Sequence, residues 1–244
     1  MDNYEFCAKW VTENAVTGSR VLDYGCGAGQ IVKLLLASRY DAFGCDVFFE
    51  GGDYSGHVDP ALLGSRIRRM EGDTIPFDDN SFDLVTNNQV MEHVPDMERA
   101  LTEIARVLRP GGKVLSLFPD RGVWREGHCG IPFLHWFPRG SDRVRVGYAA
   151  ALRAMGFGHF KKDKSILKWS RDFCEWLDLW THYRSNEEID RHYRMFFAEE
   201  TPIEDRYLLE RAGPHHLVLM LPKPLQRWLV RKLMGRVFVV TKPT

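Results

Sequence analysis

The stretch V-L-D-Y-G-C-G-A-G-Q, residues 21–30, constrains what this chain can fold into more than any other. An apolar pair leads into Asp23, glycines follow at positions 25, 27 and 29, and a helical pattern of apolar residues comes next. This order is typical of a buried strand, a tight turn and a helix start. Glycine adopts positive φ and lets a ligand approach the backbone without a Cβ in the way. The turn therefore predicts a small molecule lying across it.

The glycine spacing alone does not identify that molecule, and a purely structural turn stays open as an alternative. G-x-G-x-G departs from the dinucleotide fingerprint G-x-G-x-x-G, and no Gly-Lys-Ser/Thr follows to make a phosphate loop.

Length, charge and cysteine content limit the classes of protein. The 244 residues suit one large α/β domain or a domain with a substantial insertion. With 33 basic and 33 acidic residues, the balanced charge argues against nucleic acid as a partner. Five scattered cysteines without C-x-x-C spacing favour neither a disulfide framework nor a zinc site, and we expect no metal. An acidic start and the absence of a long apolar run predict a cytoplasmic protein.

Strand and helix patterns alternate through the first half of the chain, which predicts an α/β fold with a parallel sheet covered on both faces. Besides the strand before the glycine turn, we expect strands at Asp41–Asp46, Ile67–Glu71, Phe82–Asn88 and Lys113–Phe118, and helices at Tyr4–Asn14, Gln30–Ser38 and Asp96–Leu108.

Polar side chains close two of these strands. Asp46 lies about 20 residues beyond the glycine turn, where an α/β nucleotide site places a carboxylate for ribose hydroxyls. Asn87, Asn88 and Gln89 end the strand that starts at Phe82, at the sheet edge where ligands of open α/β sheets bind. A turn-capping aspartate is the alternative for Asp46.

Five ordered segments resemble the motif series of class I S-adenosylmethionine-dependent methyltransferases. They are V-L-D-Y-G-C-G-A-G, G-C-D, G-D-T-I-P-F-D-D-N-S-F-D-L-V, M-E-H-V and E-I-A-R-V-L-R-P-G-G-K-V-L, within about residues 18 to 120. The resemblance is to type 11 methyltransferases, similar to those of bacterial cell-surface polysaccharide pathways. It implies a Rossmann-like, seven-stranded, mostly parallel sheet with helices on both faces.

The resemblance also implies roles for individual residues. Residues 23–29 would pass under the methionine part of S-adenosylmethionine, Asp46 would hold the ribose hydroxyls and Asp73 would accept from the adenine amino group. Asn88 and Gln89 would border the amino-acid end and the sulfonium. The predicted cofactor-binding set is Asp23, Gly25, Cys26, Gly27, Gly29, Gln30, Asp46, Val47, Gly72, Asp73, Thr74, Asn88 and Gln89. Transfer of the methyl group would leave S-adenosylhomocysteine and needs mainly in-line positioning.

Three histidines are candidates for the acceptor chemistry. His93, just after the strand that ends at Asn88, is the first choice as general base because methylation of a hydroxyl requires removal of its proton. Shaping of the cofactor wall is an alternative role for it, and Glu92 is a weaker base. In the aromatic stretch 120–145, His128 and His135 can line an acceptor pocket together with Trp124, Phe133, Trp136 and Phe137. A loop folded on its own aromatic residues is the alternative.

The second half of the chain departs from the common pattern. We expect a helix at Tyr148–Met155, a sixth strand at Phe157–Lys161 and the last strand at Arg236–Thr241. The methyltransferase domain then comprises 1–163 and 236–244. Residues 164–235 form a helical insertion between the last two strands, too long for an unstructured loop. Its aromatic residues, at helical spacing, indicate the core of a lid or a homodimer surface rather than direct substrate contact.

The segment 214–244 carries basic residues and no acidic ones. A helix between Pro222 and Gly235 would place Lys223, Arg227 and Arg231 on one side and Trp228 among leucines on another. This suits peripheral association with an anionic membrane through 222–235, at the inner face. Docking of the apolar side on the sheet is the alternative.

The leading functional hypothesis is O-methylation of a hydroxyl on a sugar, polysaccharide precursor or lipid-linked intermediate. Methylation of a small aromatic or quinone-like acceptor and a non-catalytic cofactor-binding scaffold are the alternatives.

Overall fold

A computed structural model describes residues 1–213 and 217–244 of the chain. The first residues of the basic segment 214–244 thus lie outside the described residues. Within them the chain forms a seven-stranded sheet in the order β3-β2-β1-β4-β5-β7-β6. The strands are β1 (Arg20–Tyr24), β2 (Asp41–Asp46), β3 (Ile67–Arg69), β4 (Phe82–Asn88), β5 (Leu108–Phe118), β6 (Ala198–Pro202) and β7 (Arg236–Thr241).

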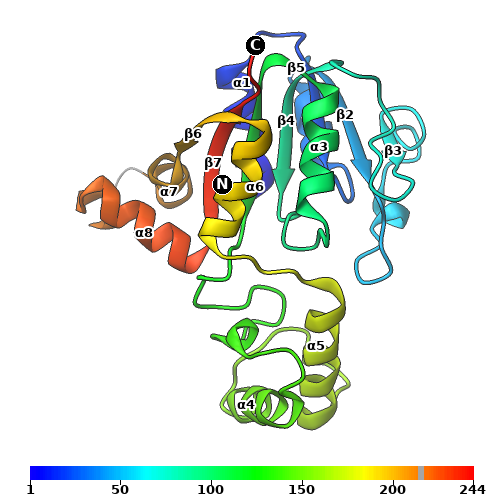
Figure 1. The fold of residues 1–244 in the computed structure, drawn as a ribbon. Helices are drawn as coiled ribbons and strands as arrows, with labels where there is room; N and C mark the ends of the chain where they lie inside the picture. The colour runs from blue at the N-terminus through cyan, green and yellow to red at the C-terminus, as the bar shows by residue number, and fades with distance from the viewer. Residues whose placement is uncertain (214–216) are drawn as a thin grey trace.

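The sheet direction confirms the predicted Rossmann-like fold class. β1 pairs in parallel with β2 and β4, and further parallel pairs join β2 to β3 and β4 to β5. Only β7 runs against its neighbours β5 and β6 among the described strands. The carboxyl ends of β1 to β5 therefore meet at one edge, the lower edge in Figure 1.

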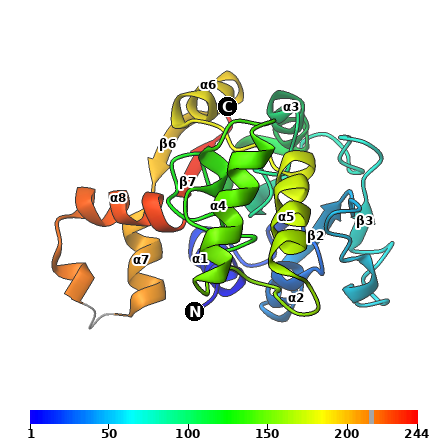
Figure 2. The same ribbon diagram turned by 90° about the horizontal axis from the view of Figure 1, so that it is seen from below.

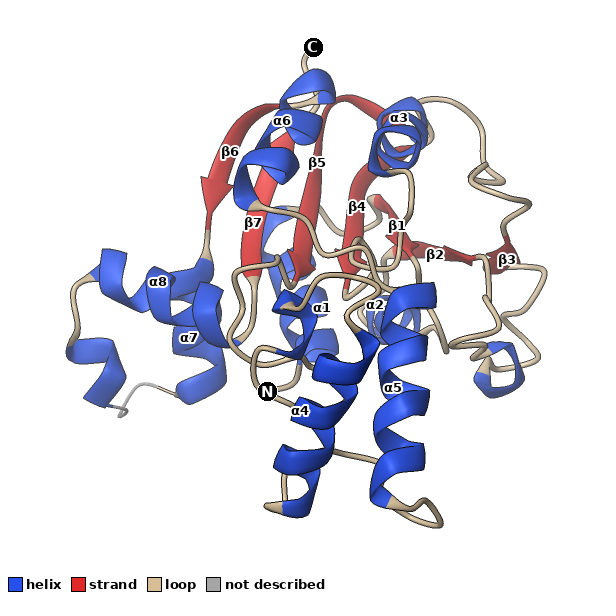
Figure 3. Ribbon diagram, turned by 60° about the horizontal axis from the view of Figure 1, so that its bottom comes forward, coloured by secondary structure: helices blue, strands red, loops and turns tan. Residues whose placement is uncertain are grey.

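Helices cover both faces of the sheet, as the amphipathic patterns predict. One face packs against α1, α2, α7 and α8 through residues such as Phe6, Leu35, Tyr207 and Val230. The other packs against α3 and α6, visible beside the strands in Figure 3. The helices are α1 (Asn3–Asn14), α2 (Gln30–Ala37), α3 (Met97–Val107), α4 (Asp142–Ala154), α5 (Ile166–Trp180), α6 (Asn186–Phe196), α7 (Glu204–Ala212) and α8 (Lys223–Leu233), with 3-10 turns at Ser55–His57, Leu134–Trp136 and Leu217–Met220.

A separate lobe, residues 119–184, hangs from the carboxyl edge of the sheet. Its two ends meet where the Arg121 N–H donates to the Arg184 carbonyl at 2.8 Å. α4 and α5 lie side by side below the sheet (Figure 2). They enclose a small core of Cys129, Ile131, Leu134, Ala149, Trp169, Cys174 and Leu177. The lobe therefore stands over the edge where the sequence predicts ligand binding.

The predicted strand at Phe157–Lys161 is wrong: these residues form an irregular segment with a bend at His159, and the sixth strand is β6 at Ala198–Pro202. β6 falls inside the range 164–235 assigned to a helical insertion, most of which is indeed helical. It was missed because A-E-E-T-P is largely exposed and contains proline, which is typical of an edge strand. Apart from β6, the division into a sheet domain and an insertion stays a prediction.

Three of the basic residues of α8, Lys223, Arg227 and Arg231, are paired with acidic residues of α7. Arg231 contacts the fully buried Glu204 at 2.7 Å, and Arg227 contacts Asp205 at 2.8 Å. α8 packs Val230 into the sheet core, whereas Leu225, Trp228 and Leu233, on the side expected to dock on the sheet, are exposed. No helix in the described part of the chain is long and apolar enough to span a membrane.

Candidate active site

The glycine turn follows β1, and its three glycines serve different purposes. Their φ angles are 72°, 50° and 75° for Gly25, Gly27 and Gly29. A Cβ on Gly25 would lie 2.4 Å from Val90, and one on Gly29 would lie 2.2 Å from Ile67. A Cβ on Gly27 would meet only the Tyr54 ring, at 3.8 Å. Packing thus requires two of the glycines, while the third leaves the open space that a ligand needs.

Asp46 ends β2 with its carboxylate turned toward the glycine turn. Its Oδ2 accepts from the Gly27 N–H at 2.8 Å, and its Oδ1 accepts from the Phe48 N–H at 2.7 Å. A carboxylate offers about four acceptor positions, so this one can still accept from two hydroxyls. Burial raises the pKa of Asp46 despite these hydrogen bonds. Asp46 thus lies against the glycine turn, and its contact with Phe48 is that of the turn-capping alternative, while the ribose role stays a prediction.

Asp23 lies beneath the turn at the end of β1, almost fully buried. Its Oδ1 accepts from the Thr86 hydroxyl at 2.8 Å. Burial, with a smaller contribution from the charge of Asp46, raises the pKa of Asp23 to about 7. A cationic group of a ligand above the turn would stabilise the ionised form.

Most of the other predicted cofactor residues follow the carboxyl ends of β2, β3 and β4, and Gln30 begins α2. Asp73 pairs with Arg99 at 3.2 Å, and the Asn88 side chain accepts from Asn3 at 3.3 Å. Gln89 is exposed with a φ of 58°. Of the remaining residues, Gln30, Val47, Gly72 and Thr74 are exposed and Cys26 is buried.

The lobe covers the segment that follows Asp46. The Trp176 indole N–H donates to the Gly51 carbonyl at 3.2 Å. Phe49 packs against Trp180 and His93, with ring centroids 5.2 and 5.5 Å away. Tyr54, beside Gly27, is a site residue that sequence reasoning missed, because it lies in a polar, glycine-rich loop without a motif.

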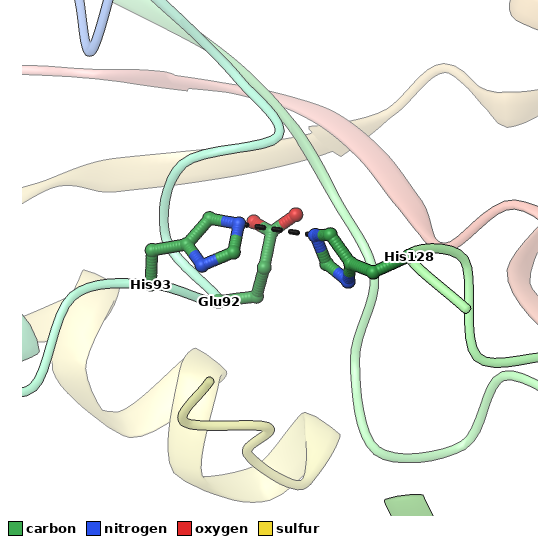
Figure 4. A group of neighbouring side chains, drawn as sticks. All are labelled: Glu92, His93 and His128. Atoms are coloured by element: carbon green, nitrogen blue, oxygen red, sulfur yellow. Dashed lines mark hydrogen bonds between the residues drawn. The ribbon is translucent and has the colours of Figure 1, made fainter. Parts of the chain in front are cut away.

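His93 and His128 come together from two distant loops at the centre of this region. Their Nε2 atoms lie 3.1 Å apart. Nδ1 of His93 lies 2.7 Å from the Trp180 carbonyl at the end of α5. Nδ1 of His128 lies 2.7 Å from Oε1 of Glu126. Figure 4 shows the two rings and Glu92 directed toward one another.

Glu126 holds His128 in this cluster and was not predicted from the sequence. It is fully buried, and the Tyr183 hydroxyl and the Cys129 N–H both donate to its carboxylate, at 2.7 and 2.6 Å. Burial alone would raise its pKa, but the hydrogen bonds, above all that from His128, lower the pKa to about 2. Nothing in R-E-G-H-C-G distinguishes Glu126 from an exposed loop acid.

Burial and neighbouring charges shift the pKa values of His93, His128 and Glu92 in different directions. Burial lowers the pKa of His93 to about 4. Burial also acts on His128, but Glu126 outweighs it and raises the pKa of that imidazole. Burial raises the pKa of Glu92 to about 7, and both Glu92 oxygens lack a hydrogen-bond partner among the described residues.

His135 does not join this pair. Its ring packs on Tyr183 with centroids 4.7 Å apart. It lines a cavity of about 440 Å³ with Arg121, Phe137, Arg139, Tyr183 and Arg184 among its walls.

The aromatic pocket predicted around His128 and His135 is only partly present. Phe137 lines the cavity, but Trp124 packs against Trp228 of α8 at 5.4 Å, and Phe133 and Trp136 pack on each other, largely exposed. Arginines line the cavity in place of these rings: Arg121 and Arg139 come from the loop after β5, Arg145 from α4 and Arg184 from the segment after α5.

Comparison with known proteins relates the first half of the chain to methyltransferases. Residues 22–116 match the family model described as a methyltransferase domain. The chain is 29% identical over 130 residues to a ubiquinone biosynthesis O-methyltransferase of Rhizobium etli, which covers 52% of each protein. It is 40% identical over 111 residues to a demethylmenaquinone methyltransferase of Staphylococcus epidermidis, which covers 43% of this chain and 45% of that protein. The chain thus spans about half the length of these curated relatives.

A solved structure resembles the whole chain. An S-adenosylmethionine-dependent methyltransferase from Mesorhizobium loti aligns with a TM-score of 0.53 at 15% identity, covering 98% of this chain and 100% of that one. At this identity the likeness concerns the fold.

Proposed function

Residues 22–116 of this chain belong to the class I S-adenosylmethionine-dependent methyltransferases, and from this premise we propose that the protein methylates a hydroxyl of a polar acceptor. The family and the cofactor predicted from the sequence are both confirmed. The acceptor and the roles of individual residues belong to the proposal.

One observation supports the proposal: His93 and His128 lie next to the glycine turn and Asp46, where the cofactor would bind. Val90 packs on Gly25, and Glu92 and His93 follow two and three residues after Val90. Phe49, three residues after Asp46, packs on His93. A donor lying over Gly27 with its ribose at Asp46 therefore has His93 and His128 as neighbours. In-line transfer requires this closeness of donor and acceptor.

The cofactor itself suits this cradle by the chemistry of its groups. Asp46 would hold the ribose hydroxyls, Gly27 would let the backbone pass close beneath, and Asp73 would bind the adenine end. S-adenosylmethionine supplies the methyl group as a sulfonium, so the protein has to position the acceptor oxygen and assist the loss of its proton.

The cavity beside His135 favours a polar acceptor. Arg121, Arg139 and Arg184 lie in its walls, and Tyr183 connects it through Glu126 to His128. Guanidinium groups bind hydroxyl-rich and anionic groups, as on a sugar or a lipid-linked intermediate. The names of the two curated relatives favour a quinone-like acceptor as the second candidate, for which this cavity supplies fewer apolar walls.

The direct test is transfer of a labelled methyl group to a panel of acceptors: hydroxyl-bearing glycans, lipid-linked sugars and hydroxylated quinones. Labelling of a sugar or lipid-linked acceptor supports the proposal. Labelling of quinones alone favours the second candidate, and transfer to carbon alone contradicts methylation of a hydroxyl.

His93→Ala provides a site-specific check in the same assay. Loss of a group that handles the acceptor proton is expected to reduce turnover at saturating cofactor by about a hundredfold or more. His159→Ala, which changes a histidine in the same lobe without touching His93 or His128, is the matched control. Near-normal turnover of His93→Ala would contradict the assigned role.

Membrane association through 222–235 is a separate part of the proposal. Because Arg227 and Arg231 are paired with α7, binding would depend on the exposed apolar residues Leu225, Trp228 and Leu233. Flotation with anionic liposomes is expected to fall for Trp228→Ser. Equal flotation of variant and wild type, or none for either, would contradict it.

A further inference from the structure

Two histidines and a carboxylate converge at one point of the lobe interface. One ligand atom from each of Glu92, His93 and His128 can be chosen so that all lie within 4.8 Å of one another. Figure 4 shows them entering from the loop after β4 and from the loop after β5. We propose that these three side chains bind a divalent transition-metal ion, for which Zn²⁺ fits the ligand set.

The orientation of the two rings is that of metal-bound histidines. Such ligands almost always give their second ring nitrogen to a carbonyl or carboxylate, which fixes the tautomer. Here Nδ1 of His93 is held by the Trp180 carbonyl and Nδ1 of His128 by Glu126, each at 2.7 Å. Each Nε2 atom is thereby left with a lone pair, and the two Nε2 atoms face each other.

The separation of the two Nε2 atoms suits a shared ion. With Zn–N bonds of about 2.05 Å, two imidazole nitrogens lie about 2.9 Å apart at a right angle and about 3.3 Å apart in a tetrahedron. The distance of 3.1 Å falls between these values. Without an ion, and with both Nδ1 atoms donating to the Trp180 carbonyl and Glu126, this contact requires one ring to carry protons on both nitrogens.

Glu92 supports the metal site independently of the two histidines. It is 1% exposed, and neither carboxylate oxygen meets a hydrogen-bond donor in the described residues. A buried carboxylate without partners is costly, and a cation is what such a group coordinates. The backbone holds it in place, because the His182 N–H donates to the Glu92 carbonyl at 2.6 Å.

Three protein ligands leave coordination positions open, as in catalytic zinc sites. The His128 side chain is 28% exposed, so an outside oxygen atom can reach the ion. Resting on the proposed function, we assign that position to the acceptor hydroxyl. In the metal-bound protein His93 would act on the acceptor proton through the ion and not as a base, because coordination makes the O–H more acidic and its proton passes to water. An oxygen lone pair then forms the O–CH₃ bond while the C–S bond breaks, its electrons remain on sulfur, and S-adenosylhomocysteine leaves.

Metal binding is tested on chelator-treated, dialysed full-length protein by calorimetric titration with Zn²⁺ and by the visible absorption of added Co²⁺. Because His215 and His216 are adjacent in the sequence, every protein carries His215→Ala and His216→Ala. We expect one Zn²⁺ per chain. His128→Ala and Glu92→Gln should weaken it more than about a hundredfold, and Glu126→Gln, which loosens the support of His128, by about ten- to a hundredfold.

His159→Ala is the matched control and should bind Zn²⁺ as the parent protein does, and thermal melts verify that each variant is folded. Failure of the parent protein to bind a stoichiometric ion, or unchanged binding by His128→Ala and Glu92→Gln, overturns the site. Titration of the metal-free protein with S-adenosylhomocysteine separates the two proposals. Cofactor binding without metal binding leaves the methyltransferase standing, and metal binding without cofactor binding leaves only the metal site.

Discussion

At the scale of single residues, burial determines how the turn responds to pH. Asp23 is ionised easily in the unfolded chain, with an ordinary pKa of 3.8, and its pKa is about 7 in the folded protein. The folded state therefore holds a proton that the unfolded state has lost between these two values. Stability conferred by this group falls as pH rises from about 4 to about 7 and is level above that.

Asp23→Asn removes this dependence while retaining an acceptor for the Thr86 hydroxyl. The variant is expected to gain stability relative to wild type as pH rises, up to about 4 kcal/mol near pH 8. Urea unfolding at pH 5 and pH 8 measures the difference. A stability gap that stays constant between these two pH values would show that Asp23 does not titrate in this window.

Two glycines of the turn have different roles: Gly29 is required for packing, and Gly27 leaves space for the ligand. Gly29→Ala introduces a Cβ 2.2 Å from Ile67 at positive φ and is expected to cost about 3 kcal/mol of stability. Gly27→Ala meets only the edge of Tyr54 and should cost about 1 kcal/mol, yet weaken cofactor binding at least tenfold. Denaturant melts and calorimetry on both variants check this. Tight cofactor binding by Gly27→Ala would place the ligand elsewhere.

At the scale of elements, the helices and strands that could be predicted are those whose own residues mark where they begin and end. The bounds of β2, β4 and β7 match the predicted residues, since apolar runs end there in polar residues. Asp96 caps α3 as predicted, accepting from the Arg99 N–H at 3.0 Å. β6 and α7 were not predicted because their stability comes from pairing with β7 and α8 rather than from their own pattern.

The α7–α8 pair gives a test of how α8 is held. Glu204 is fully buried, so Arg231→Met leaves a buried carboxylate without its ion-pair partner. We expect a loss of about 2 kcal/mol, below the value for a fully buried pair because Arg231 is one-third exposed. Lys223→Met, which removes a 76% exposed lysine from the same helix, is the control and should change little. Equal stability of both variants would mean that Arg231 does not hold α8.

At the scale of the whole molecule, the lobe joins parts of the chain that no local pattern relates. The approach of Asp46 to the glycine turn could be predicted, because the order of strands in an α/β sheet sets it. Tyr183 reaches Glu126 across 57 residues of sequence, and the Trp180 carbonyl reaches His93 across 87. These contacts depend on how α5 docks under the sheet, which composition and periodicity do not specify.

The central claim is that the cofactor lies on the glycine turn with its ribose at Asp46, directly under the lobe. Calorimetric titration with S-adenosylhomocysteine tests it on wild type, Asp46→Ala and Asp53→Ala, the last removing an exposed aspartate seven residues away. We predict one site per chain for wild type and Asp53→Ala. For Asp46→Ala we predict a loss of about 2 kcal/mol or more, or at least about thirtyfold in Kd. Absence of binding to wild type, or equal affinity of Asp46→Ala, would contradict the claim.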